Sequence, residues 1–280
     1  MKNWSRKNRF RNPPSTGVVP KSSDCLPTSA GVFRFEFTPN GDDLIAALTD
    51  GTLAQFSVNQ RQQTSSVKAS DSMLLDVSIT NSSFLTSDNN GHVMLLDRAS
   101  SSLIQTRDVH HLPYTNEGCE VWTCSFLNDT MYASGGEDAF LKIWDYRSDS
   151  KVAELKHFES GVTFVAPSKS DTDKIYTGSY DEHCRIFDTR NFSQVYKEIK
   201  LPGGVWNIEQ GENDLLAACM YGGWTSMTNE LEITSQDVDS GKQLLYGATM
   251  NKKYIAYVTF NDYRVTARQQ GVTAVGKQMK

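Results

Sequence analysis

One pattern recurs six times along the chain: a short apolar strand, a polar turn rich in Asp, Asn and Gly, and a second alternating strand. The six copies are residues 46–56, 86–96, 134–144, 177–187, 217–227 and 258–268. Alignment places Asp50, Asn90, Asp138, Asp181, Tyr221 and Asp262 at one position, with successive members 40, 48, 43, 40 and 41 residues apart. Self-similarity at such a period indicates a repeat architecture in which each unit is one supersecondary motif.

Each copy is expected to form strands. Apolar and polar residues alternate with a period of two, as in Leu141-Lys142-Ile143-Trp144, and a further alternating stretch precedes most copies, for example 31–37 and 121–126. Six positions after the aligned turn residue stand Phe56, Leu96, Trp144, Phe187, Met227 and Arg268. Five of these six side chains are large and apolar, as packing between sheets requires.

A unit of about four strands, repeated every roughly 40–45 residues and closed radially, is a β-propeller, which protects the edges of its sheets. The predicted fold class is therefore all-β, with six recognisable blades; a seven-bladed ring with one degenerate or missing blade remains open. We expect one propeller domain over residues 31–270. It would lie between a flexible, basic, Pro-containing tail (1–30) and a C-terminal tail (271–280).

The charge of the chain is unevenly distributed. In total, 28 Lys and Arg stand against 33 Asp and Glu, a formal charge of −5. The bases of residues 1–30 are Lys2, Arg6, Lys7, Arg9, Arg11 and Lys21. With Asp24 as the one acid there, this segment has a charge of +5 and the rest of the chain −10. An acidic body argues against nucleic-acid binding, which depends on Lys and Arg contacts to phosphate.

The basic start of the chain lacks the apolar core of a secretory signal. A mitochondrial presequence is the alternative to a flexible tail, although Pro13-Pro14 disfavours the helix that such a presequence forms. No apolar run approaches the roughly 20 residues that cross a bilayer, so we expect no membrane partner.

The cysteines and histidines indicate neither a disulfide framework nor a metal site. Five scattered cysteines, an odd number, are typical of reduced thiols and favour a cytoplasmic location; they are Cys25, Cys119, Cys124, Cys184 and Cys219. The five histidines fall in different repeats, and the adjacent His110 and His111 would point in opposite directions in an extended segment. No Gly-x-x-x-x-Gly-Lys-Ser/Thr run indicates a nucleotide site.

Two of the repeats end as WD-repeat blades do. Ile143-Trp144-Asp145 closes the third copy and Ile186-Phe187-Asp188 the fourth, so the chain resembles the WD-repeat family. In the third copy, His111 or His110 is expected to relay through Ser134 and Asp138 to the indole of Trp144. The fourth copy keeps His157, Thr177 and Asp181, but Phe187 has no N–H to donate.

A narrower resemblance rests on particular stretches of sequence. The stretch Tyr176-Thr177-Gly178-Ser179-Tyr180-Asp181-Glu182-His183, followed by Phe187-Asp188-Thr189-Arg190-Asn191, is similar to the diphthine methylesterase family. Further matching stretches are 134–138, 203–206, 216–220 and 245–248, so the resemblance covers roughly 117–250. It implies hydrolysis of a methyl ester on a modified histidine of translation elongation factor 2, giving diphthine and methanol. That factor would be the partner, and no cofactor is expected.

The same stretch supplies candidate catalytic groups. An imidazole can take a proton from water at cellular pH and a neighbouring carboxylate can orient it, so we hypothesise His183 as general base with Glu182 or Asp181 as its partner. The alternative is that His183 only satisfies the turn. The nearest approach to a serine-hydrolase elbow, Thr177-Gly178-Ser179-Tyr180-Asp181, lacks the second Gly, so direct attack by water is expected.

Two tryptophans are candidates for substrate binding. Trp122 lies 16 residues before Asp138, and Trp206 lies 15 before Tyr221, so both begin an inner strand near the channel mouth. With Glu120 nearby, they are predicted to hold the trimethylammonium group that the resemblance implies for the substrate. The alternative is that both indoles fill core between neighbouring blades.

An interaction scaffold is the competing class of function. Trp144-Asp145-Tyr146-Arg147 and Phe187-Asp188-Thr189-Arg190 each end a blade with Asp-x-Arg. This resembles the box through which substrate receptors dock the adaptor of a cullin-RING ubiquitin ligase, with Arg147 and Arg190 as the docking residues. The alternative is that each Asp-x-Arg is a local ion pair within its blade.

Overall fold

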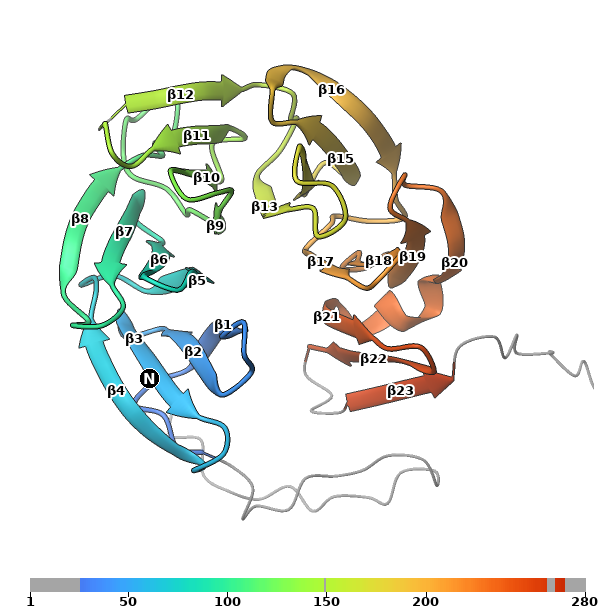
Figure 1. The fold of residues 1–280 in the computed structure, drawn as a ribbon. Coiled ribbons are helices and arrows are strands. Elements are labelled where there is room, and N and C mark those ends of the chain that lie inside the picture. The colour runs from blue at the N-terminus through green and yellow to red at the C-terminus, as the bar shows by residue number, and fades with distance from the viewer. Residues whose placement is uncertain (1–25, 149, 261–264, 270–280) are drawn as a thin grey trace, which may run out of the picture.

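Six antiparallel sheets surround a common centre in the computed structural model of the chain, which describes residues 26–148, 150–260 and 265–269 (Figure 1). The first strand of each sheet lies innermost, and these strands pack in sequence from blade 1 to blade 6. The predicted six-bladed propeller is confirmed. Residues 1–25 of the predicted N-terminal tail and all of the predicted C-terminal tail (271–280) lie outside the described residues, and so do Cys25, Asp262 and residue 270.

The first three blades are each a four-stranded sheet. Blade 1 consists of β1 (Val32–Phe37), β2 (Asp43–Leu48), β3 (Thr52–Ser57) and β4 (Gln62–Lys68). Blade 2 consists of β5 (Leu74–Ile79), β6 (Ser83–Asp88), β7 (His92–Asp97) and β8 (Leu103–Asp108). Blade 3 consists of β9 (Thr123–Phe126), β10 (Met131–Gly135), β11 (Leu141–Asp145) and β12 (Ser150–Leu155).

The last three blades continue the order. Blade 4 consists of β13 (Val162–Pro167), β14 (Lys174–Ser179), β15 (His183–Asp188) and β16 (Asn191–Lys200). Blade 5 consists of β17 (Asn207–Gln210), β18 (Asp214–Ala218), β19 (Trp224–Thr228) and β20 (Ile233–Asp237), and a 3-10 helix, η2 (Val238–Gln243), follows it. Blade 6 consists of β21 (Leu245–Met250), β22 (Tyr254–Thr259) and β23 (Val265–Gln269). In the described part of the chain, no helix is long and apolar enough to span a membrane.

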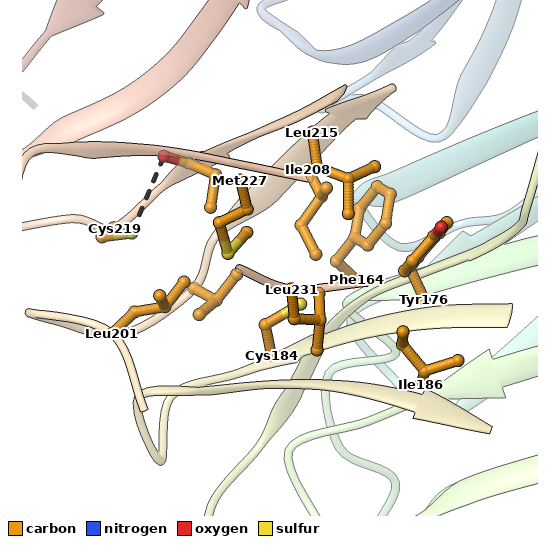
Figure 2. Packing of buried hydrophobic residues seen from close by; sticks show 12 residues of the cluster. Phe164, Tyr176, Cys184, Ile186, Leu201, Ile208, Leu215, Cys219, Met227 and Leu231 are labelled. Atoms are coloured by element: carbon orange, nitrogen blue, oxygen red, sulfur yellow. Dashed lines mark hydrogen bonds between the residues drawn. The ribbon is translucent and has the colours of Figure 1, made fainter. Parts of the chain in front are cut away.

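The apolar core lies between neighbouring blades. Figure 2 shows one such layer, in which Phe164 and Tyr176 of blade 4 face Leu215 and Met227 of blade 5. Of the side chains predicted to pack six positions after each turn, four are buried: Phe56, Leu96, Phe187 and Met227. Arg268, the exception in the pattern, is exposed and pairs with Asp237. The alternation seen in the sequence therefore marks the faces that stack sheet on sheet.

The hydrogen-bonded relay of blade 3 runs through His110. Its Nδ1 lies 2.8 Å from Asp138 Oδ1, its Nε2 lies 2.8 Å from Ser134 Oγ, and Trp144 Nε1 donates to the same Oγ at 3.0 Å. His111 instead pairs with Asp108 on the surface. The relay is structural, because its imidazole is completely buried.

Blade 4 lacks this relay, as Phe187 has no donor. His157 rests against the Phe187 ring, with centroids 5.7 Å apart. Asp181, at the position of Asp138, pairs with Arg185 instead of a histidine ring from the preceding loop. Equivalent positions of blades 3 and 4 are thus held by different polar networks.

Candidate functional site

Six aromatic side chains meet at one end of the central channel. We name them the aromatic cluster: Phe33, Trp122, Tyr180, Trp206, Tyr246 and Phe260. They come from the starts of inner strands or from turns between second and third strands, and the antiparallel order of each blade puts these positions on one face. Five blades therefore contribute to a single aromatic surface.

The two predicted tryptophans are at the centre of the aromatic cluster. The ring centroids of Trp122 and Trp206 lie 5.6 Å apart, and the Tyr180 ring lies 6.1 Å from Trp122 and 6.0 Å from Trp206. Because the indoles touch each other edge to face, no ligand fits between them. Both indoles remain partly exposed, so a ligand would rest against their solvent-facing side.

Acidic groups border the aromatic cluster. Trp122 Nε1 donates to Glu137 Oε2 at 2.7 Å, and the Glu137 backbone N–H donates to the carbonyl of Glu120 at 2.9 Å. Burial, and then the negative charges of Glu137 and Glu120, raises the pKa of the Tyr180 phenol. Electron-rich rings beside carboxylates attract cations, above all quaternary ammonium groups.

Glu120, one of the predicted substrate-binding residues, lies two residues before Trp122 on the same face. Glu120 accepts a hydrogen bond through its backbone carbonyl, whereas Glu137 binds the Trp122 indole through its side-chain carboxylate. The structure therefore adds Glu137 to the acidic border that the sequence suggested for Glu120.

The predicted catalytic residues lie in the turn between β14 and β15. His183 Nδ1 is 2.8 Å from the Asp181 carbonyl oxygen and 3.5 Å from its Oδ1. The Asp181 carboxylate is buried and its Oδ2 lies 2.9 Å from Arg185 Nη1. Glu182, with φ of 69°, turns outward and pairs with Lys200 at 3.2 Å. The turn therefore brings His183 to Asp181 and directs Glu182 away.

His183 stands further from the channel than the aromatic cluster does. It opens β15, the third strand of its blade, and is paired with Lys200 of the outermost strand β16. Its imidazole is 27% exposed. Tyr180, in the same turn as Asp181, is the link between this pair and the aromatic cluster.

A group of charged side chains that no sequence pattern predicted lies next to the aromatic cluster, and we name it the charged layer: Arg34, Glu36 and Asp76. Arg34 Nε is 3.4 Å from Asp76 Oδ1, and the Arg34 guanidinium carbon is 5.9 Å from the centre of the Trp206 ring. Burial, and then the charge of Asp76, raises the pKa of Glu36 to about 8. Burial also raises the pKa of Asp76, against the effect of Arg34.

The two arginines predicted to dock an adaptor lie on the opposite face from the aromatic cluster, because they follow third strands. Arg147 Nη2 is 2.7 Å from Asp145, and Arg190 Nη2 is 2.6 Å from Asp188. Hydrogen bonds from these arginines lower the pKa of Asp145 and of Asp188 to about 2. Both arginines are well exposed, at 62% and 69%.

The thiols of the described cysteines are buried and unpaired: Cys119, Cys124, Cys184 and Cys219. Burial raises the pKa of Cys119 to about 11 and that of Cys219 to about 12, which keeps both protonated and poorly nucleophilic. Within residues 26–148, 150–260 and 265–269, no three His, Cys, Asp or Glu side chains are placed to hold a metal ion.

Sequence reasoning missed four members of the aromatic cluster, which join the two predicted tryptophans: Phe33, Tyr180, Tyr246 and Phe260. One signal was available. Phe33 and Tyr246 each lie at the second residue of an inner strand, close to the register of Trp122 and Trp206 just before β9 and β17. Arg34 and Glu36 alternate with Phe33 on β1, but nothing local shows that they face the channel.

Comparison with known proteins agrees with the fold. Residues 104–145 and 149–188 match the repeat described as WD domain, G-beta repeat. A chain of the Mitotic Checkpoint Complex superimposes with a TM-score of 0.74 over 87% of this chain and 78% of its own, at 14% identity. The computationally designed Ika8 protein superimposes with a TM-score of 0.67 over 87% of this chain and 73% of its own, at 12% identity.

Sequence similarity points to a narrower group. The diphthine methyltransferase of Mus musculus is 30% identical over 181 residues, which are 59% of this chain and 36% of that protein. That of Homo sapiens is 36% identical over 111 residues, 38% of this chain and 25% of the relative. The Dictyostelium discoideum homolog is 31% identical over 130 residues, 40% and 35% of the two chains. The matches thus span about a third or less of each relative. The chain is a six-bladed β-propeller that contains WD repeats within residues 104–188 and is similar in part to proteins named diphthine methyltransferase.

Proposed function

We propose that this protein hydrolyses the methyl ester of methylated diphthine on translation elongation factor 2, giving diphthine and methanol. The observation that carries the proposal is the aromatic cluster with its acidic border, which suits the trimethylammonium group at the end of that side chain. The relatives named for diphthine support it, as do the sequence stretches within 117–250. Elongation takes place in the cytoplasm, so the proposal puts the protein there.

The reaction needs an activated water. A water oxygen bonds to the acyl carbon of the ester, the bond from that carbon to the methoxy oxygen breaks, and methoxide leaves with a proton as methanol. His183 is the proposed base that takes the proton of the attacking water, with the Asp181 carbonyl oxygen 2.8 Å from its Nδ1 to fix the ring. No cofactor enters this balance.

In this proposal, the trimethylammonium group of the substrate binds the aromatic cluster and orients the ester beside it. A trimethylammonium group resting on the solvent-facing side of Trp122 and Trp206 contacts two aromatic ring systems. A cation–π contact of this kind is worth about 2 kcal/mol when it is desolvated. The Glu137 side chain, which accepts the Trp122 N–H, lies beside that position. The ester at the same end of the side chain is thereby held near the channel.

Release of the methyl group from elongation factor 2 tests the proposal. The factor carrying the methylated intermediate is incubated with the protein, and mass spectrometry follows the modified histidine. The expected result is loss of one methyl group, unchanged by a chelator. Persistent methylation in the presence of folded protein would contradict the proposed activity.

The chain offers a matched control for the proposed base. His183 opens β15, and His92 occupies the same place at the start of β7, with its Nδ1 3.1 Å from Asp88. We expect His183→Ala to slow methyl release by about 100-fold or more, a typical contribution of general base catalysis, and His92→Ala to leave it unchanged. Equal rates for the two variants would remove His183 from the mechanism.

Adaptor docking is a second proposal, independent of the first. It is favoured by the exposure of Arg147 and Arg190 on the face opposite the aromatic cluster. Each guanidinium already binds its own Asp, so docking would have to share or replace that ion pair. Loss of a cullin-RING adaptor from pull-downs with Arg147→Ala and Arg190→Ala, with methyl release intact, is the expected result; no adaptor with wild-type protein would refute docking.

A further inference from the structure

Arg34 crosses from blade 1 to two other blades. It leaves β1, reaches Asp76 of β5 through Nε at 3.4 Å, and reaches Asn207 Oδ1 of β17 through Nη1 at 3.5 Å. Its guanidinium carbon lies 5.9 Å from the centre of the Trp206 ring. One cation therefore joins the aromatic cluster to the interior of the channel.

Asp76 is built to hold this arginine. Its carboxylate is 7% exposed and accepts hydrogen bonds from the backbone N–H groups of Val77 and Cys124, both at 2.9 Å. With its position fixed by two neighbouring blades, the carboxylate orients the guanidinium through Nε. Within the described part of the chain, Arg34 contacts Asp76 through Nε and Asn207 through Nη1, and its side chain remains 18% exposed.

The charge around Arg34 favours an incoming anion or carbonyl oxygen. Glu36, two residues further along β1, has its pKa raised to about 8, so it is neutral for the most part at pH 7. Lys169 adds a second positive charge near Glu36. Among these neighbours, Asp76 is thus the carboxylate paired with Arg34. A guanidinium presents several N–H donors and binds a carboxylate or a developing oxyanion well.

We propose that Arg34 binds the carboxyl end of the substrate: the ester carbonyl oxygen before hydrolysis and the carboxylate of the product after it. This inference rests on the proposed function, because the ester and the trimethylammonium group end the same side chain. With the cation on the Trp206 side of the aromatic cluster, the ester lies next to the guanidinium that already contacts that ring. Arg34 is then the donor that stabilises the oxyanion formed by water attack, and Asp76 is its positioning residue.

Binding of small probes separates this role from a structural ion pair. The probes are tetramethylammonium, N,N,N-trimethylalanine and the methyl ester of that amino acid, titrated by calorimetry. We expect wild-type protein to bind the free acid more tightly than tetramethylammonium. In the Arg34→Gln variant, the affinity for the free acid should fall by about tenfold or more. The affinity for tetramethylammonium should stay within about twofold of the wild-type value.

Variants control for folding and for charge alone. Arg34→Lys keeps a cation beside Asp76 but loses the planar fork, so an intermediate loss of acid binding is expected even if Arg34→Gln does not fold. Arg98→Gln is the matched control, since Arg98 bonds the Thr80 carbonyl away from the channel and should change neither probe. Acid binding that is the same in wild type, Arg34→Lys and Arg34→Gln would overturn the inference.

Kinetics separate this inference from the proposed function itself. On methylated elongation factor 2, Arg34→Gln is expected to lower kcat by about 100-fold, as removal of an oxyanion donor does, with a smaller change in KM. Wild-type methyl release with an unchanged kcat in Arg34→Gln would overturn the role of Arg34 and leave the proposed function standing. No methyl release by folded wild type would contradict both.

Discussion

Single residues divide into those whose partners are local and those whose partners come from other blades. The blade 3 relay could be predicted because Ser134, Asp138 and Trp144 lie in one hairpin. The choice between His110 and His111 could not, because it depends on which of two adjacent side chains turns inward as the chain enters the next blade. The role of Arg34 could not be predicted from the sequence either, because its partner Asn207 lies 173 positions away in the chain.

Glu36 makes stability depend on pH. Its pKa rises from 4.5 in the unfolded chain to about 8 in the folded protein, so between these values the folded state binds the extra proton. The free energy of unfolding therefore falls as pH rises through this window, by at most about 1.4 kcal/mol per pH unit for one group, and levels off above pH 8. Asp76, whose pKa is also raised, acts in the same direction.

Replacing the Glu36 carboxyl by an amide removes its contribution to the pH dependence of stability. We expect Glu36→Gln to match wild type near pH 5 and to be the more stable protein at pH 8, because the amide never ionises. Urea unfolding at both pH values measures the difference, with the exposed Glu212→Gln as control. A Glu36→Gln variant that loses stability between pH 5 and pH 8 as steeply as wild type would contradict this account.

At the scale of elements, the hairpins are the part of the fold that the sequence predicts best. The second and third strands recur with the six aligned segments, and in blades 1 to 5 the turns between them lie where the sequence pattern predicted them. The outermost strands are mostly exposed and show little alternation of apolar and polar residues; they are β4, β8, β12, β16 and β20. The sequence therefore predicted an approximate number of strands per blade but not the positions of these outer strands.

Turn glycines provide a test of how tightly the hairpins pack against the following loops. Gly91 has φ of 91°, and a Cβ there would meet the His110 carbonyl oxygen at 2.5 Å. Gly41 has φ of 73° but open space around it. Both alanine variants carry the backbone cost of about 1–2 kcal/mol, and Gly91→Ala adds a steric cost of about 1–3 kcal/mol. The free energy of unfolding, measured by chemical denaturation, should therefore be lower for Gly91→Ala than for Gly41→Ala. Equal values would mean that the loop bearing His110 shifts without cost, and they would contradict the tight packing described for this turn.

At the scale of the whole molecule, the ring assembles a site that no blade contains. The period of the repeats predicts the order of blades, and the position of Trp122 and Trp206 predicts that two indoles reach the channel mouth. Their contact with Phe33, Tyr180 and Arg34 exists only because the blades curve around one centre. Local sequence patterns do not encode how distant blades are brought around one centre, so four of the six members of the aromatic cluster and the whole charged layer emerged from the structure.

The most direct test of the central claim traces the oxygen atoms of the reaction. A single turnover on methylated elongation factor 2 is run in water labelled with heavy oxygen, and mass spectrometry reads the product side chain. Hydrolysis predicts one labelled oxygen in the new carboxylate and unlabelled methanol, because water attacks the acyl carbon. Loss of the methyl group with both original oxygens retained would show that the bond between oxygen and the methyl carbon breaks instead, and it would contradict water attack on the acyl carbon.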